Sequence, residues 1–164
     1  MKLRKLERKD APLMMEWMHD ASVVEFMQAN FKEKTLEDCE RFIAQSLEDF
    51  ENLHLAIAND EDEYMGTVSL KSISTDKGDA EFAIAIRREA MGQGYAWYGM
   101  EHILQIGFEE YGLRRIYWCV SAHNIRACRF YNKHGFVERE DIPAEIFADY
   151  GADNDLKWYA TSRQ

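Results

Sequence analysis

Residues 81–96 read Glu-Phe-Ala-Ile-Ala-Ile-Arg-Arg-Glu-Ala-Met-Gly-Gln-Gly-Tyr-Ala, and this stretch decides the fold. Alternating apolar residues predict a strand over 81–86, and a loop ending in Gly-x-Gly leads into a helical pattern. Glycine permits a positive φ and a close approach of the backbone to a ligand. A helix N-terminus presents free N–H groups and the positive end of the helix dipole. This corner therefore indicates an anion site, most simply for a phosphate or pyrophosphate, although an ordinary tight turn shares the pattern.

Two well-known phosphate-binding motifs are excluded. The third glycine of a dinucleotide-binding fingerprint is missing, and antiparallel strands rather than a strand–helix–strand unit precede the turn. A Walker A loop is excluded because no Gly-Lys-Ser/Thr follows.

The elements around this corner predict a mixed sheet. Short turns separate the three strands that lead up to residue 86, which predicts an antiparallel meander. The long amphipathic helix after Gly94 is closed by Gly112, and a buried strand follows, so one strand pair should be parallel. The predicted strands are 2–7, 54–58, 64–73, 81–86, 116–120, 136–140 and 156–160, and further helices begin after Asp10, after Asp20 or Ser22, after Thr35 and at Asn124.

Composition bounds the class of protein. The 164 residues contain no repeat and no linker, so we expect one domain over residues 1–164. Apolar runs such as 82–86 are too short to span a membrane, no signal peptide is recognisable, and three cysteines without a CxxC pair fit a reducing cytoplasm and no metal site. The net charge of −10 argues against nucleic acid or an anionic membrane as partner and is compatible with a cationic substrate.

Residues 124–136, Asn-Ile-Arg-Ala-Cys-Arg-Phe-Tyr-Asn-Lys-His-Gly-Phe, predict a capped amphipathic helix with Ala127 and Tyr131 one turn apart. Together with residues 89–94, this segment resembles the GNAT superfamily of acetyl-CoA-dependent N-acetyltransferases. The family's motifs are Q/R-x-x-G-x-G/A and N-x-x-A-x-x-x-Y-x-K-x-G-F. The order of elements also matches, so the resemblance covers nearly the whole chain. It is similar to the branch that holds ribosomal-protein, spermidine and amino-sugar acetyltransferases.

The resemblance implies an α/β (α+β) fold, a single GNAT-like domain with a mixed, mostly antiparallel sheet of about six to seven strands. A central parallel pair, 81–86 and 116–120, should splay apart and be flanked by helices. Acetyl-CoA is expected between these two strands, with its pantetheine arm on the backbone of the first strand and its pyrophosphate on the glycine loop. The expected contacts are Ile84, Ala85, Ile86, Met91, Gly92, Gln93, Gly94, Tyr95, Ala96 and Asn124.

The implied reaction is a direct attack of a primary amine on the thioester, with no metal. Tyr131 matches the family position of the general acid that protonates the leaving thiolate. A backbone N–H on the cofactor strand is expected to stabilise the oxyanion. Glu81 is the candidate base, against a structural ion pair with a nearby lysine or arginine. His54, His102, His123 and His134 are alternatives as base.

The acceptor stays open between a protein N-terminus, a polyamine and an amino sugar. The N-terminal helices and the tail should build its pocket, and a homodimer would fit the many aromatic residues. Glu89 and Met91 depart from the first motif and are expected to weaken acetyl-CoA binding, with Arg87 and Arg88 compensating; a catalytically weak acyl-CoA sensor is the alternative. The pocket candidates are Trp17, Phe26, Met27, Phe31 and Tyr150, with Glu25, Glu33, Asp149 and Asp153 to attract a cation.

Overall fold

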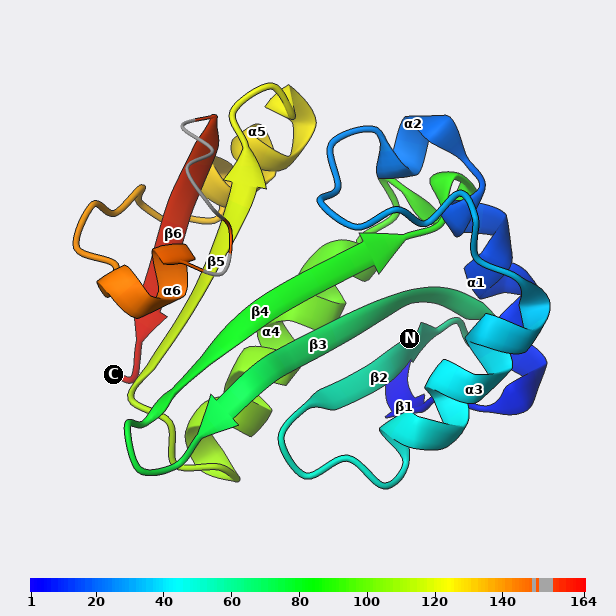
Figure 1. The fold of residues 1–164 in the computed structure, drawn as a ribbon, viewed down its shortest axis with the longest axis horizontal. Helices are drawn as coiled ribbons and strands as arrows, with labels where there is room; N and C mark the ends of the chain where they lie inside the picture. The colour runs from blue at the N-terminus through cyan, green and yellow to red at the C-terminus, as the bar shows by residue number, and fades with distance from the viewer. Residues whose placement is uncertain (149, 151–154) are drawn as a thin grey trace.

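Six strands form one sheet in the order β1–β2–β3–β4–β5–β6 in the computed structural model, which describes residues 1–148, 150 and 155–164 (Figure 1). Helix α4 covers one face of this sheet, and α1, α3 and α6 lie on the other. We call these the α4 face and the α3 face. The strands are β1 (Lys2–Lys5), β2 (Leu53–Ala58), β3 (Tyr64–Ser74), β4 (Asp79–Ile86), β5 (Arg115–Ser121) and β6 (Leu156–Ser162).

Three helices begin with the predicted side-chain caps, Asp20, Thr35 and Asn124. Thr35 and Asp38 form the expected capping box, in which each side chain accepts from the other residue's backbone N–H. Asp20 caps its helix through the N–H of Ser22. The helical segments are η1 (Arg8–Asp10), α1 (Ala11–Met18), α2 (Ala21–Val24), α3 (Leu36–Ser46), η2 (Arg88–Ala90), α4 (Tyr95–Glu109), α5 (Ile125–Lys133) and α6 (Ala144–Ala148). Among the described residues, no helix has the length and apolar character that a membrane crossing requires.

Among the described strands, β4 and β5 are the only parallel neighbours, and their pairing is short. It joins Asp79 to Arg115, Ala80 to Ile116 and Glu81 to Tyr117, and all other neighbouring strands are antiparallel. Beyond Glu81 the two strands diverge, as Figure 1 shows. The predicted splayed parallel pair and meander are therefore confirmed.

Helix α4 sits close to the sheet because two of its positions lack a side chain. A Cβ on Gly99 would lie 2.4 Å from Cδ1 of Ile57, and one on Gly107 would lie 2.8 Å from Cδ1 of Ile116. The apolar stripe of α4, with Met100 and Ile103 fully buried, packs on strands β2 to β5. This packing fixes the N-terminus of α4 near the end of β4.

The prediction of a strand over 136–140 is wrong. This segment makes one isolated bridge, from Glu138 to Tyr159 on β6. Val137 is 68% exposed and charged residues follow it, so the segment has little apolar surface to hold it on the sheet. The short helix α6 was not predicted, and α2 ends at Val24, before the apolar residues Phe26 and Met27.

Candidate active site

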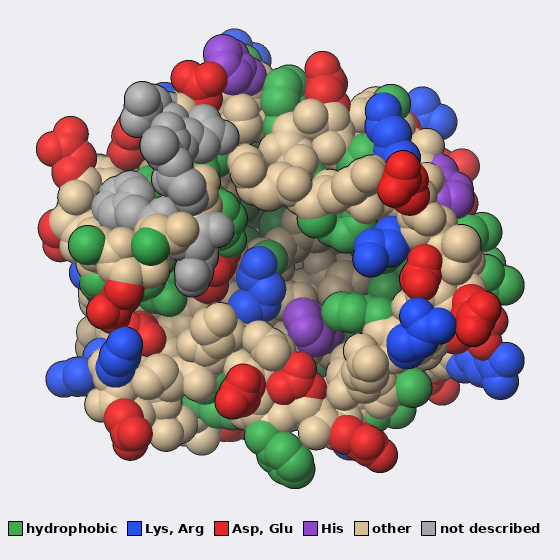
Figure 2. Space-filling model, in the orientation of Figure 1, with side chains coloured by type: hydrophobic (Ala, Val, Ile, Leu, Met, Phe, Trp, Pro, Cys, Tyr) green, Lys and Arg blue, Asp and Glu red, His purple; other side chains and the backbone are tan. Residues whose placement is uncertain are grey.

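The divergence of β4 from β5 leaves one edge of β4 without a partner strand. Residues 82–86 keep their antiparallel pairing with β3, from Phe82–Leu70 to Ile86–Gly66, but none of them pairs with β5. Free backbone N–H and C=O groups on a strand edge can bind an extended, amide-bearing chain as an added strand would. The predicted pantetheine contacts, 84–86, lie on this edge. Figure 2, in the orientation of Figure 1, shows a hollow near the centre of the surface.

The glycine loop lies between this edge and α4. Gly92 and Gly94 have φ of 77° and 91°, and Gly94 is the left-handed N-cap of α4. A Cβ on Gly92 would have no neighbour within 4 Å, so the loop has an open concave side. The first backbone N–H groups of α4 have no partner within the helix. The N–H of Met91, however, already donates to the carbonyl of Arg88 at 3.2 Å. Donors for an anion therefore come from residues after Met91.

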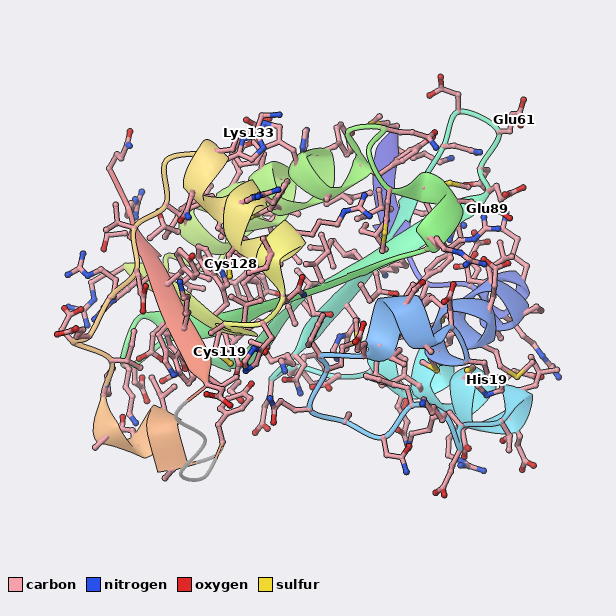
Figure 3. All side chains as sticks on the ribbon, turned by 90° about the horizontal axis from the view of Figure 1, so that it is seen from above. His19, Glu61, Glu89, Cys119, Cys128 and Lys133 are labelled. Carbon is pink, nitrogen blue, oxygen red and sulfur yellow. The ribbon has the colours of Figure 1, made fainter. Side chains whose placement is uncertain are left out.

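Arg87 anchors the start of this loop. Its side chain is only 5% exposed and makes ion pairs with Glu16 and Glu63 at 2.9 Å and with Glu89 at 3.5 Å. Hydrogen bonding to Glu16, against some loss from burial, raises the pKa of the guanidinium. Figure 3 shows Glu89 at the end of the molecule that holds the N-terminal helices.

The negative charge of Glu89, which departs from the motif, is therefore compensated by an arginine of the same chain. Arg87 neutralises Glu89 instead of facing a cofactor phosphate, and Arg88 pairs with Asp20 at 3.2 Å. Both guanidinium groups are engaged within the chain, so the acetyl-CoA contacts we expected from them are not supported by this arrangement. The positive field at the loop comes from the backbone of α4.

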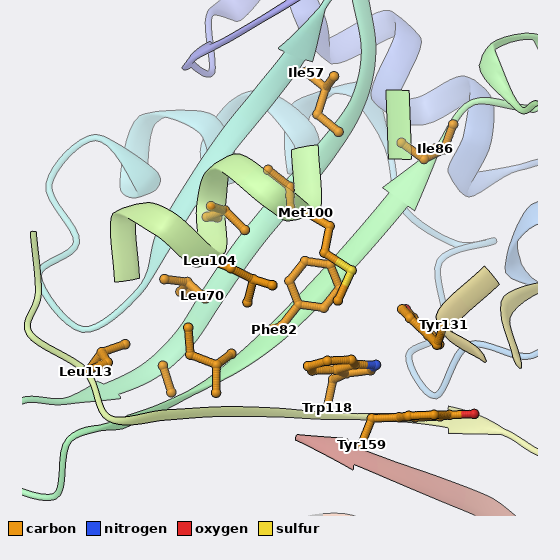
Figure 4. Close-up of a cluster of buried hydrophobic side chains, with 14 of the residues drawn as sticks. Ile57, Leu70, Phe82, Ile86, Met100, Leu104, Leu113, Trp118, Tyr131 and Tyr159 are labelled. Atoms are coloured by element: carbon orange, nitrogen blue, oxygen red, sulfur yellow. The ribbon is translucent and has the colours of Figure 1, made fainter. Parts of the chain in front are cut away.

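Tyr131 lies on the α4 face, between the diverging strands (Figure 4). Helix α5 carries it, and Asn124 caps that helix by accepting from the N–H of Ala127 at 3.2 Å. The ring of Tyr131 packs against Trp118 and Tyr159, with centroids 5.4 and 5.2 Å apart. Burial raises the pKa of the phenol, so it stays protonated at neutral pH. Among the described residues, none forms a hydrogen bond with its hydroxyl.

Glu81 lies on the α3 face, across the sheet from Tyr131. It is the last β4 residue paired with β5, and its side chain alternates with that of Phe82, which packs under α4. The carboxylate accepts a hydrogen bond from the hydroxyl of Tyr150 and lies 3.6 Å from Nζ of Lys71. Burial and this hydrogen bond raise the pKa of Tyr150. Glu81 therefore lies on the cofactor strand, as predicted. It also has the lysine partner that is expected if its role is only structural.

A second polar pair on the α3 face was not predicted as a pair. Nδ1 of His54 on β2 lies 2.6 Å from Oγ of Ser69 on β3, and the ring of Phe42 covers the imidazole with centroids 4.8 Å apart. Burial lowers the pKa of His54. The strand register, which places Ser69 opposite both His54 and Ala83, could have revealed this pair once the meander was assumed.

Comparison with known proteins identifies the family. The family model described as the acetyltransferase (GNAT) domain matches residues 1–137. The chain belongs to the GNAT acetyltransferase family. It is an acetyl-CoA-dependent N-acetyltransferase.

Two curated relatives and one solved structure describe what this GNAT acetyltransferase resembles. It is 26% identical over 157 residues to the spermidine N(1)-acetyltransferase of Vibrio cholerae. The matched region covers 94% of this chain and 88% of that protein. It is 28% identical over 139 residues to an uncharacterised N-acetyltransferase, p20, of Bacillus licheniformis, covering 82% of this chain and 77% of that protein. The crystal structure of the Vibrio cholerae spermidine N-acetyltransferase in complex with CoA and spermine superposes with a TM-score of 0.81 at 23% identity, covering 98% and 94% of the two chains.

The acceptor-pocket candidates of this GNAT acetyltransferase fall into four groups. Trp17 is a core residue, because its Nε1 donates to the hydroxyl of buried Tyr64 at 2.8 Å and its ring packs on Phe31. Tyr150 borders the α3 face through Glu81. Glu25, Phe26 and Glu33 are exposed, and Met27 is partly buried. Asp149 and Asp153 lie outside the described residues.

A substitution in the glycine loop gives the first testable prediction. Gly92→Ala is expected to raise the KM of the enzyme for acetyl-CoA about tenfold, because a methyl group would enter the open side of the loop and strain a residue with φ of 77° by about 1–2 kcal/mol. Initial-rate kinetics at varied acetyl-CoA measure this effect.

Gly112→Ala is the matched control for that variant. Gly112 has φ of 66°, and a Cβ there would also meet nothing within 4 Å, but it lies at the other end of α4. It should cost similar stability and leave the KM for acetyl-CoA unchanged. Equal KM values for the two variants would contradict the assignment of the loop as the pyrophosphate site.

Proposed function

We propose that this GNAT acetyltransferase moves the acetyl group of acetyl-CoA to a primary amine of a polyamine. The divergence of β4 from β5 at Glu81 carries the proposal, because it opens a strand edge between the glycine loop and Tyr131. The net charge of −10 favours a polycationic acceptor, and the relative from Vibrio cholerae is named for spermidine. We take residues 1–164 as one catalytic domain.

The binding roles follow from the backbone. The free edge over Ile84, Ala85 and Ile86 pairs with the amides of the pantetheine arm. The loop and first turn of α4 bind the pyrophosphate through N–H groups, with Met91 shaping the loop rather than donating. Asn124 holds α5, and with it Tyr131, beside the arm. The pyrophosphate donors are Gly92, Gln93, Gly94, Tyr95 and Ala96.

The catalytic roles follow from the two faces of the sheet. Acetyl-CoA supplies an activated acyl group, and holding it beside the amine removes most of the entropic cost of their encounter. The amine approaches from the α3 face, to which Glu81 and Ala83 both belong. Tyr131, on the α4 face, gives its proton to the leaving thiolate. Glu81, the last β4 residue paired with β5, lies where the strands separate, and its carboxylate attracts the incoming ammonium.

Turnover with a panel of amines tests the proposal. Release of free thiol from acetyl-CoA should be fastest with spermidine or spermine, and slower by about tenfold or more with an amino-sugar nucleotide and with short peptides that have Ser, Ala or Thr at the N-terminus. Faster thiol release with a peptide or an amino sugar would move the function to that acceptor class. Absence of turnover with tight acetyl-CoA binding by calorimetry would favour an acyl-CoA sensor, and absence of both would overturn the acetyltransferase site.

A further inference from the structure

We propose that Ser69 and His54 form the proton path that deprotonates the acceptor ammonium, with His54 as the final acceptor. The inference rests on the proposed function, since it names the proton acceptor of the same site. His54 acts through Ser69, so it is a positioning and proton-storing group rather than a residue in contact with substrate.

The strand register places this pair in line with the cleft. His54 lies opposite Ser69, and Ser69 lies opposite Ala83, so the three form a row across β2, β3 and β4 on the α3 face. Ala83 is two residues beyond Glu81, where β4 has already lost β5 as a neighbour. Neighbouring strands lie about 4.8 Å apart, so the row reaches from the open edge of β4 to the imidazole over roughly 10 Å. Ala83 carries only a methyl group on this face, and the proposed path includes one water that bridges the ammonium and Ser69.

The other polar residues that β3 directs to this face are already engaged. Thr67 lies 2.6 Å from the hydroxyl of Tyr64, and Lys71 pairs with Glu81. Ser69 alone of these three contacts an imidazole, that of His54, which can accept and release a proton. The carboxylate of Glu81 is already engaged as well, because it lies 3.6 Å from Nζ of Lys71 and accepts a hydrogen bond from the hydroxyl of Tyr150.

The charges around His54 leave it neutral at pH 7. Phe42 on α3 covers the ring, Asp49 lies on the loop before β2, and Lys71 lies on β3. Burial lowers the pKa of His54, the field of Asp49 opposes that shift, and Lys71 adds to it. Nδ1 of the neutral imidazole accepts from the Ser69 hydroxyl in the tautomer that carries hydrogen on Nε2.

The proton balance is complete without another reactant. One N–H bond of the ammonium breaks and its proton passes to a bridging water, which gives a proton to Oγ of Ser69 as that hydroxyl gives its own to Nδ1 of His54. The imidazolium then releases one proton to solvent. The nitrogen loses a second proton when the C–N bond forms and the C–S bond breaks. In the same step Tyr131 gives one proton to the thiolate, so these two transfers cancel in the overall count. The reaction therefore consumes an ammonium and releases one proton.

The pH dependence of kcat at saturating acetyl-CoA and amine tests the path. For the wild-type enzyme, kcat should be level from neutral pH to pH 9. For His54→Gln, which keeps a partner for Ser69 but cannot titrate, kcat should fall about 10- to 100-fold at pH 7 and then rise about tenfold per pH unit until it reaches the wild-type value between about pH 8 and about pH 9. Ser69→Ala should behave like His54→Gln, and Ser69→Thr, which retains a hydroxyl, should restore the wild-type profile.

Two further variants separate the possible causes. His102→Gln removes a histidine whose Nδ1 lies 2.8 Å from the carbonyl of Tyr98 on α4, and its profile should match that of the wild type. A His54→Gln profile parallel to that of the wild type, or the sloping profile in Glu81→Gln instead, would overturn the path while leaving the acetyltransferase function in place. Failure of the wild-type enzyme to acetylate any amine would instead overturn the proposed function, and the path with it.

Discussion

Tyr131→Phe is expected to lower kcat by about 10²- to 10³-fold while acetyl-CoA affinity changes less than about twofold. The hydroxyl has no hydrogen-bond partner among the described residues, so its removal leaves the packing against Trp118 and Tyr159 intact. The lost function is the proton for the leaving thiolate, since burial keeps the phenol protonated at neutral pH. Steady-state kinetics measure kcat, and calorimetry with acetyl-CoA measures the affinity.

Tyr159→Phe is the control for this variant. Its ring belongs to the same aromatic cluster, but its hydroxyl donates to Oδ1 of Asn132 at 3.2 Å. We expect a loss of about 1 kcal/mol of stability and nearly normal kcat. An equal loss of kcat in both variants would show that Tyr131 acts by packing, and would remove it as the general acid.

Arg87→Met is expected to lower the free energy of unfolding by about 3 kcal/mol, and urea unfolding measures this change. The guanidinium is buried and holds three carboxylates together, from α1, from the turn just before β3 and from η2. Methionine fills similar space but leaves Glu16, Glu63 and Glu89 to repel one another. The loop before α4 starts at this residue, so the KM for acetyl-CoA should rise as well.

Arg88→Met is the neighbouring control. Arg88 is 70% exposed, and its one ion-pair partner in the described part of the chain is Asp20. Exposed ion pairs contribute little to stability, so unfolding and KM should both stay close to the wild-type values. Similar losses in the two variants would mean that charge in this segment, rather than the buried anchor, determines stability.

The features predicted correctly from the sequence depend on neighbours in the chain. The capping box at Thr35 and Asp38 needs only a turn of helix, and the positive φ of Gly92 and Gly94 follows from a tight corner between strand and helix. The strand alternation over 81–86 also fixed the faces of Glu81 and Phe82. The family resemblance supplied the splay and the place of Tyr131.

The features that sequence reasoning missed depend on distant partners. Asp10 precedes α1 as predicted but does not cap it, because its carboxylate binds the guanidinium of Arg4. Arg87 is set by carboxylates 71 and 24 residues away, and His54 by a serine on the next strand. The strand expected over 136–140 failed because alternation alone does not supply a free sheet edge with apolar cover.

The short pairing of β4 with β5 also bears on how long the enzyme survives. Through the sheet, three residue pairs connect the four-stranded part to β5 and β6. In the proposed site, an acyl donor hydrogen-bonded along the open edge would act as a temporary strand across that gap, and would therefore stabilise the fold as well as react. A donor present at one hundred times its Kd adds about 2.7 kcal/mol to the folded state. The concentration of acetyl-CoA should therefore change the resistance of the protein to unfolding and proteolysis, and the protein should persist longest where acetyl-CoA is abundant.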